Sequence, residues 1–144
     1  MLKKALIYSG IQTVPLMGCL VVALYEYNCE YYRTFPQTPN VLDFAKYERE
    51  DLTKGFEDFL TIDNLLETKV GDCEDLAAAY AAWLTVVAKR VARPTIAEYQ
   101  LPSGTINLHC FTRDVASGKE YDPSLALGMP PAPVGSRRLR QWLL

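Results

Sequence analysis

The sequence has one histidine, His109, and no Cys-x-x-Cys pair among its four cysteines, Cys19, Cys29, Cys73 and Cys110. A structural zinc site needs about four closely spaced cysteine or histidine ligands, so this scarcity argues against a zinc finger, and we expect no metal or other cofactor. Three of the cysteines lie among apolar or aromatic residues, where a reduced thiol is the commoner state. The pattern therefore favours a reduced chain in the cytoplasm.

Excess positive charge and long apolar runs are also missing. The 15 Lys and Arg residues oppose 17 Asp and Glu residues, which gives a net charge of −2 and no reason to expect a nucleic-acid partner. No stretch reaches the ~18–20 uninterrupted apolar residues that would span a membrane. A chain of 144 residues suffices for one domain with a real core, and nothing in it indicates an oligomeric state.

The N-terminus contains a pattern that could mislead. The ending Leu16-Met17-Gly18-Cys19 resembles a lipoprotein cleavage site. The apolar core of a signal peptide is poorly formed, however, because it is interrupted by Ser9, Gln12, Thr13 and Pro15. Apolar residues also continue past the cysteine as "LVVALYEY". We therefore expect no signal peptide here.

Two segments have helical spacing of apolar residues. The first runs from Pro15 to about Arg33 and is ended by the prolines of "TFPQTPN". The second runs from Asp72 to about Arg90, with Asp72 as N-cap and Asp75 as the acidic half of a capping box. Residues 41–71 are mixed and predict surface loops with short helical turns.

The period then changes to that of strands. The segments "TIAEYQL", "TINLHCF" and "KEYDPS" are separated by turn residues, which predicts an antiparallel meander of at least three strands. The sequence thus predicts an α+β fold, with a helix packed on a small antiparallel sheet and an additional N-terminal helix. We expect one domain over residues 1–129. The segment 130–144 is a Pro-rich, basic and apolar tail whose end, "SRRLRQWLL", could form a docking helix.

Cys73 lies at the predicted start of the second helix, in "KVGDCEDLAAAYAAWL". Unpaired backbone N–H groups and the helix dipole favour negative charge there, which predicts a lowered thiol pKa. The neighbouring acids can be occupied by capping. The alternative is a buried structural cysteine at a helix start, and the local sequence leaves both open.

His109 and Asp122 extend this candidate site. A thiol nucleophile needs a base, and His109 is the only imidazole in the chain. If the turn between the strands centres on Ala116 and Ser117, Phe111 faces Asp122, and Asp122 becomes a diagonal neighbour of His109 on one sheet face. That carboxylate could then orient the imidazole. The prediction depends on register, and Asp122 could also be part of a turn that ends the strand.

The order of these motifs resembles the transglutaminase-like superfamily of papain-like fold. The resemblance rests on a cysteine in "GDCEDLAAAYAAWL", a histidine in "SGTINLHCF" and an aspartate in "GKEYDPS". It is closer to small transglutaminase-like proteins of tailed bacteriophages, through "YYRTFPQTP", "GDCEDLAA" and "YDPSLALGM", and covers about residues 20–129. It implies a nucleophile helix on an antiparallel sheet. Cys73 would be the nucleophile, His109 the general base and acid, and Asp122 the orienting carboxylate.

The resemblance implies a cysteine peptidase, amidase or amine-transferring enzyme that acts on a protein or peptide. Structural proteins of a phage are candidate substrates, in the host cytoplasm or the virion. No second oxyanion donor is identifiable, since Glu67 and Lys69 stand where some papain-like enzymes place a glutamine or tryptophan. The alternative is a non-enzymatic virion or assembly protein that keeps the fold and docks to other structural proteins. A metal site built from Cys73, His109, Asp72 and Asp122 is the weakest interpretation.

Overall fold

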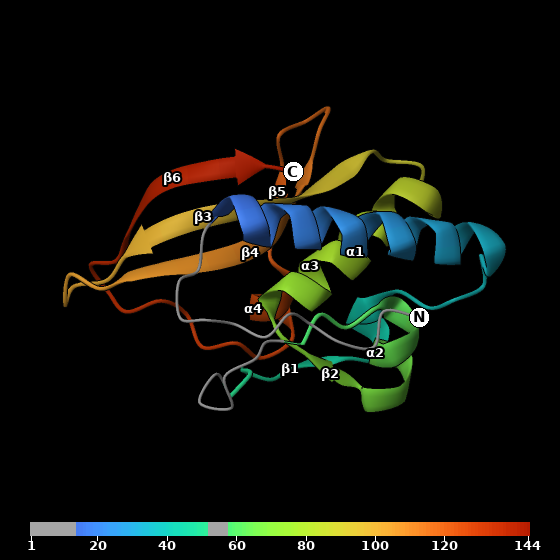
Figure 1. Cartoon of the computed structure of the whole chain (residues 1–144), viewed down its shortest axis with the longest axis horizontal. Coiled ribbons are helices and arrows are strands. Elements are labelled where there is room, and N and C mark those ends of the chain that lie inside the picture. Colours follow the sequence, from blue (N-terminus) through green and yellow to red (C-terminus); the bar gives the residue numbers. More distant parts are fainter. Residues whose placement is uncertain (1–13, 52–57) are drawn as a thin grey trace.

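The computed structural model describes residues 14–51 and 58–144. The fold is α+β, as predicted: an N-terminal helix and a second long helix lie beside a small antiparallel sheet, with shorter elements at one end (Figure 1). Predictions that fall on residues 1–13 and 52–57 lie outside the described residues. These are the first part of the signal-like N-terminus and part of the mixed segment 41–71.

Helix α1 spans Val14–Thr34 and confirms the first predicted helix. Pro15 falls in its first turn, where its missing N–H costs nothing. The helix packs along α3, the second long helix (Cys73–Val86), and their buried contact surface forms much of the core (Figure 1). The most deeply buried side chains of the chain include Val21, Leu24, Tyr32, Ile62, Leu65, Leu76 and Ile96.

Helix α3 begins where the sequence predicts and ends four residues earlier than Arg90. Its last turn is closed by Lys89, which adopts the left-handed conformation at φ 58°. The N–H of Arg90 then donates to the carbonyl of Leu84 at 2.8 Å, an arrangement typical of helix C-termini. Because the helix ends at this turn, the first strand of the sheet can begin at Ala92.

The sheet contains β3 (Ala92–Gln100), β4 (Ile106–Asp114), β5 (Glu120–Tyr121) and β6 (Arg137–Leu143) in the order β5-β4-β3-β6. The predicted antiparallel meander is confirmed for β3, β4 and β5. The third strand is shorter than predicted, because Asp122 leaves the sheet to cap helix α4 (Pro123–Ala126).

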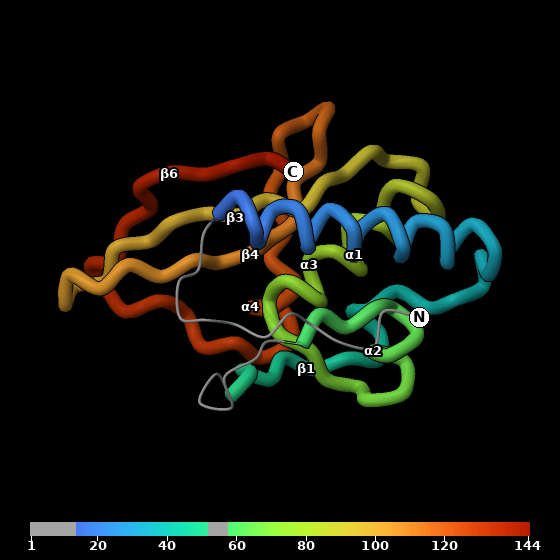
Figure 2. The backbone as a smooth tube through the Cα atoms, viewed as in Figure 1, coloured from blue at the N-terminus to red at the C-terminus, as the bar shows by residue number. Residues whose placement is uncertain are grey.

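Strand β6 corrects the prediction of a docking helix in "SRRLRQWLL". Residues Arg137–Leu143 form an edge strand that pairs antiparallel with β3, with a register shift at Glu98 and Tyr99. After β6 the C-terminal end of the chain lies beside the first part of α1 (Figure 2). A methyl group added at Gly18 of that helix would lie 3.3 Å from Leu144. The C-terminal segment is therefore part of the sheet.

Shorter elements connect the helices to one another below the sheet. They are the 3-10 helix η1 (Val41–Asp43), β1 (Lys46–Tyr47), α2 (Ile62–Thr68) and β2 (Val70–Gly71), with β1 and β2 parallel. The N–H of Tyr47 donates to the carbonyl of Leu127 at 3.0 Å, just after α4. Backbone hydrogen bonds thus connect the segment that leads into α3 to the segment that follows β5.

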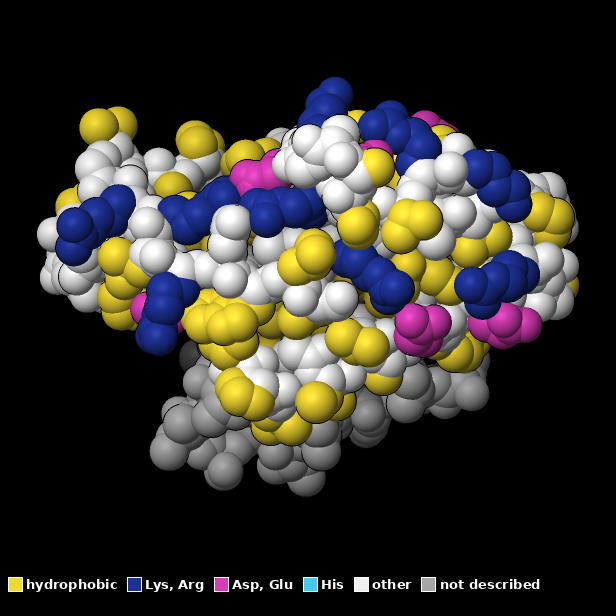
Figure 3. All heavy atoms as spheres, turned by 90° about the horizontal axis from the view of Figure 1, so that it is seen from above, with side chains coloured by type: hydrophobic (Ala, Val, Ile, Leu, Met, Phe, Trp, Pro, Cys, Tyr) yellow, Lys and Arg dark blue, Asp and Glu magenta, His cyan; other side chains and the backbone are white. Residues whose placement is uncertain are grey.

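Among the helices that the structure describes, none has the length and apolar character needed to cross a bilayer. Seen from above, the molecule carries Lys and Arg side chains along much of its visible face, with acidic side chains beside some of them (Figure 3). The sheet also has cross-strand ion pairs, such as that of Arg140 on β6 with Glu98 on β3 at 3.3 Å.

Candidate active site

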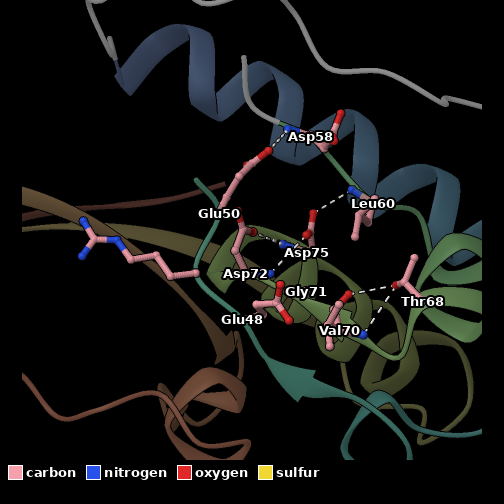
Figure 4. Close-up of a pocket in the computed structure, with 10 residues that line it drawn as sticks. Glu48, Glu50, Asp58, Leu60, Thr68, Val70, Gly71, Asp72 and Asp75 are labelled. Atoms are coloured by element: carbon pink, nitrogen blue, oxygen red, sulfur yellow. Dashed lines mark hydrogen bonds between the residues drawn. The ribbon is translucent and has the colours of Figure 1, made fainter. Parts of the chain in front are cut away.

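The start of α3 has the predicted capping box. A side-chain oxygen of Asp72 accepts from the N–H of Asp75 at 3.4 Å, and Oδ2 of Asp75 accepts from the N–H of Asp72 at 3.2 Å (Figure 4). The other oxygen of Asp75 accepts from the N–H of Leu60 at 2.7 Å. Both acids are therefore occupied by backbone donors, and Cys73 is the first residue of the helix.

Gly71, two residues before Cys73, allows this turn to pack tightly. A Cβ atom at this position would lie 2.7 Å from Cδ2 of Leu65 and 3.2 Å from Cβ of Asp75. The first distance is too short for two carbon atoms. The glycine of "GDCED" is thus required by close packing at the point where β2 turns into α3.

The surroundings of Cys73 raise the pKa of its thiol, so the prediction of a lowered pKa is wrong. Burial raises its pKa well above the ordinary 9.0, and the charges of Glu74, Asp72 and Cys110 raise it further. The thiol also donates to Oε2 of Glu74 at 2.9 Å, which stabilises the protonated form. Desolvation and nearby carboxylates outweigh the helix dipole here. Cys73 therefore rests as a neutral, half-buried thiol.

Cys110 lies on the face of β4 that packs against α3. The hydroxyl of Thr112 donates to the carbonyl of Ala77 in α3 at 2.9 Å, and strand alternation gives Cys110 the same orientation. His109 and Phe111 project from the other face. Among the contacts that the structure describes for residues 14–51 and 58–144, Cys73 is hydrogen-bonded to Glu74 and His109 to Asp122, and none joins Cys73 to His109. Among the described residues, β5 pairs with β4 only at Thr112 and Arg113, so His109 lies at the sheet edge beyond the end of β5.

His109 and Asp122 come together as predicted. The pairing of Thr112 with Tyr121 continues as Phe111 opposite Asp122, which is the predicted register. Nε2 of His109 lies 2.7 Å from Oδ2 of Asp122, and because a carboxylate only accepts, Nε2–H is the donor. Oδ1 of Asp122 accepts from the N–H of Leu125 at 3.2 Å, which caps α4 and fixes the carboxylate. Nδ1 is then the nitrogen that can accept a proton.

Sequence reasoning missed the groups that surround the imidazole. Tyr99 contacts the ring of His109 edge-on at 6.3 Å between centroids, and Phe111 lies at 6.4 Å with an interplanar angle of 27°. Arg138 of β6 reaches over both aromatic rings. The basic run "RRLR" was the only signal in the sequence, and it does not indicate which strand its arginines contact.

An acidic cavity lies beside the start of α3. It has a volume of about 230 Å³ and is lined by Glu48, Arg49, Glu50, Asp58, Leu60, Thr68, Val70, Gly71, Asp72 and Asp75 (Figure 4). Within residues 14–51 and 58–144, no group of three or more His, Cys, Asp or Glu side chains is arranged to hold a metal ion. The cavity adjoins the residues that directly precede Cys73.

Comparison with known proteins finds a distant structural similarity. No protein-family model matches the chain, and no curated protein matches it. Among solved structures, it is similar to a chain described as a "Putative Cysteine Protease from Cytophaga hutchinsonii", with a TM-score of 0.40 and 9% sequence identity. The similarity covers 89% of this chain and 50% of that one, so the chain spans half the length of that protein.

Proposed function

We propose that this protein is a thiol-dependent acyl-transfer enzyme with a transglutaminase-like, papain-like core. Cys73 is the nucleophile, His109 the general base and acid, and Asp122 the orienting carboxylate. The observation that carries the proposal is the 2.7 Å contact between Nε2 of His109 and Oδ2 of Asp122, which orients the ring and leaves Nδ1 as the nitrogen that can act as a base. The cap on α4 keeps that carboxylate in one orientation.

The neutral thiol determines how the first step would proceed. As Sγ of Cys73 attacks the carbonyl carbon of a carboxamide, its proton passes to Nδ1 of His109, and the carbonyl oxygen becomes an oxyanion. The N–H of Cys73 at the helix start is one donor to that oxyanion. Collapse breaks the C–N bond, and the amine leaves with the proton from His109. Water or a second amine then attacks the thioester and restores the thiol.

The substrate is the carboxamide of a protein or peptide side chain or backbone. Through the resemblance to small phage-encoded proteins, structural proteins of a tailed phage are the substrates that we propose, in the virion or the host cytoplasm. Hydrolysis is the simpler outcome for a small domain, whereas an amine acceptor would produce a cross-link.

An activated ester tests the mechanism without knowledge of the substrate. The chain with Cys19→Ser, which removes the exposed thiol, is mixed with 4-nitrophenyl acetate. We expect a burst of 4-nitrophenolate and an acetyl group on the peptide that contains Cys73. Cys73→Ala abolishes both, and His109→Ala slows acetylation by about 10²–10⁴-fold.

Two further variants sharpen the comparison. Asp122→Asn keeps a side chain that can cap α4 but removes the charge that orients His109, so it should also slow acetylation. Asn107→Ala, at an exposed position two residues before the histidine, should leave the rate unchanged. Equal acetylation rates for wild type and His109→Ala would overturn the proposal.

One observation favours a second function, in which the domain only docks to other structural proteins. The raised pKa of Cys73 and its hydrogen bond to Glu74 are typical of a structural thiol. This function predicts that phage structural proteins assemble equally well with wild type and Cys73→Ala, and that incubation with either produces no cleavage or cross-link. A Cys73-dependent mass change in any co-encoded protein would contradict it.

A further inference from the structure

Arg138 connects the four strands of the sheet on the face that carries His109. From β6, its guanidinium donates to both carboxylate oxygens of Glu120 on β5, each at 2.9 Å. It also donates to the hydroxyl of Tyr99 on β3 at 2.8 and 3.1 Å. Its Cζ lies 4.8 Å from the ring centroid of Phe111 on β4. A planar fork with several donors is suited to such a junction, whereas an ammonium group is not.

The same guanidinium holds the rings that contact His109. Cζ of Arg138 lies 5.5 Å from the centroid of Tyr99, so both aromatic neighbours of the imidazole are also cation–π partners of Arg138. Phe111 is almost fully buried, at 2% exposure, although it lies on the face of β4 that points away from α3. Arg138 and the imidazole thus contact the same two rings.

The guanidinium of Arg138 also holds the strand that leads to Asp122, the hydrogen-bond partner of His109. Glu120 is the first residue of the two-residue strand β5 and lies two residues before Asp122, the N-cap of α4, so its side chain leaves the chain on the same face. Arg113 pairs with Glu120 at 3.0 Å from β4. The two arginines therefore fix the first residue of β5, and with it the short strand that leads to Asp122.

We propose that Arg138 is a positioning residue that fixes the relative orientation of His109 and Asp122, through the rings of Tyr99 and Phe111 on one side and through Glu120 on the other. Its meaning for catalysis rests on the function proposed above. Its effect on the imidazole does not, because orientation of the ring can be measured without a substrate.

The single histidine makes the test direct. In the ¹⁵N-labelled full chain, long-range ¹H–¹⁵N spectra at mildly alkaline pH report the tautomer of His109 without any assignment problem. In wild type we expect the Nε2–H tautomer to predominate. In Arg138→Gln we expect the two ring nitrogens to shift toward each other as the second tautomer appears, and the acetylation rate of Cys73 to fall about 10- to 100-fold.

Matched variants separate positioning from general stability. Arg140→Gln on the same strand removes the contact with Glu98 and should leave the imidazole spectrum unchanged. Arg138→Lys keeps the charge without the fork and should shift the spectrum in the same direction as Arg138→Gln. If Arg138→Gln does not fold, Phe111→Leu removes one of the two rings and tests the same contact.

The outcomes are distinct for the two proposals. A wild-type imidazole spectrum in folded Arg138→Gln and Arg138→Lys, even with lower melting temperatures, would overturn the positioning role. A changed imidazole spectrum, together with no acetylation of Cys73 in wild type, would support the positioning role and refute acyl transfer.

Discussion

The thiol of Cys73 donates a hydrogen bond to the carboxylate of its chain neighbour Glu74, at 2.9 Å. This contact and burial both keep the proton on sulfur, so the thiol resists ionisation at the very position where a helix dipole favours it. The reactivity of Cys73 should therefore depend on the charge of Glu74.

We expect iodoacetamide to alkylate Cys73 slowly at neutral pH and to accelerate only above the ordinary thiol pKa of 9.0. Glu74→Gln removes the charge that raises this pKa, so alkylation should become faster at neutral pH. Mass spectrometry of the modified peptides over a pH series measures both rates. Glu30→Gln, at an exposed position on α1, is the control. Alkylation of Cys73 as fast as that of exposed Cys19 at pH 7 in wild type would contradict the prediction.

Gly71→Ala should destabilise the chain by about 1–3 kcal/mol, because the new methyl group would overlap Leu65 and press on Asp75. Urea denaturation measures the change in the free energy of unfolding. Gly18→Ala is a useful control, since its methyl group meets only the side chain of the last residue, Leu144, at 3.3 Å. Its effect should stay within about 1 kcal/mol. Equal losses for both variants would argue against close packing at Gly71.

Asp114 should contribute stability that depends on pH. The N–H of Ser117 donates to this carboxylate, and Arg90 pairs with it at 2.8 Å, so its pKa lies below the ordinary 3.8. A lowered carboxyl pKa stabilises the fold above the unfolded-state value, and this stability is lost as pH falls through the folded-state value. Asp114→Asn should therefore lower the melting temperature at pH 7 and reduce its fall toward acid pH. An acid response equal to that of wild type would contradict this assignment.

Removal of β6 should destabilise the whole sheet. A chain that ends at Ser136 loses the pairing with β3 and the apolar contacts of Trp142 and Leu144 with the core, roughly 2–4 kcal/mol. Thermal unfolding followed by circular dichroism measures the loss. Val134→Ser, at a position that is 99% exposed, should leave the melting temperature unchanged. An unchanged melting temperature in the truncated chain would show that β6 is dispensable.

Local patterns in the sequence determine the parts of the fold that were predicted correctly. The capping box of Asp72 and Asp75 lies within four residues, and the spacing of apolar residues in α1 and α3 needs no distant partner. The register of β4 with β5 follows from one short turn, which is why the contact of His109 with Asp122 could be predicted.

The features that were missed depend on distant partners. Strand β6 pairs with a strand about 40 residues earlier, and its basic-apolar pattern suits a helix equally well until that partner is known. The pKa of Cys73 is raised first by burial, which the helix start does not reveal, and then by the charges of Glu74 and Asp72. The predicted lowering of that pKa took no account of burial and treated the neighbouring acids as neutralised by capping, whereas their charges still act on the thiol.

The hydrogen bond from Tyr47 to Leu127 has a mechanical consequence. From Cys73, the chain runs back through β2 to its partner β1, across this bond to the end of α4, and through the cap at Asp122 to His109. Every connection in this circuit is a covalent bond or a short hydrogen bond. The relative position of Cys73 and His109 is therefore set by this closed circuit of backbone connections, so we expect a displacement at any one of them to change it.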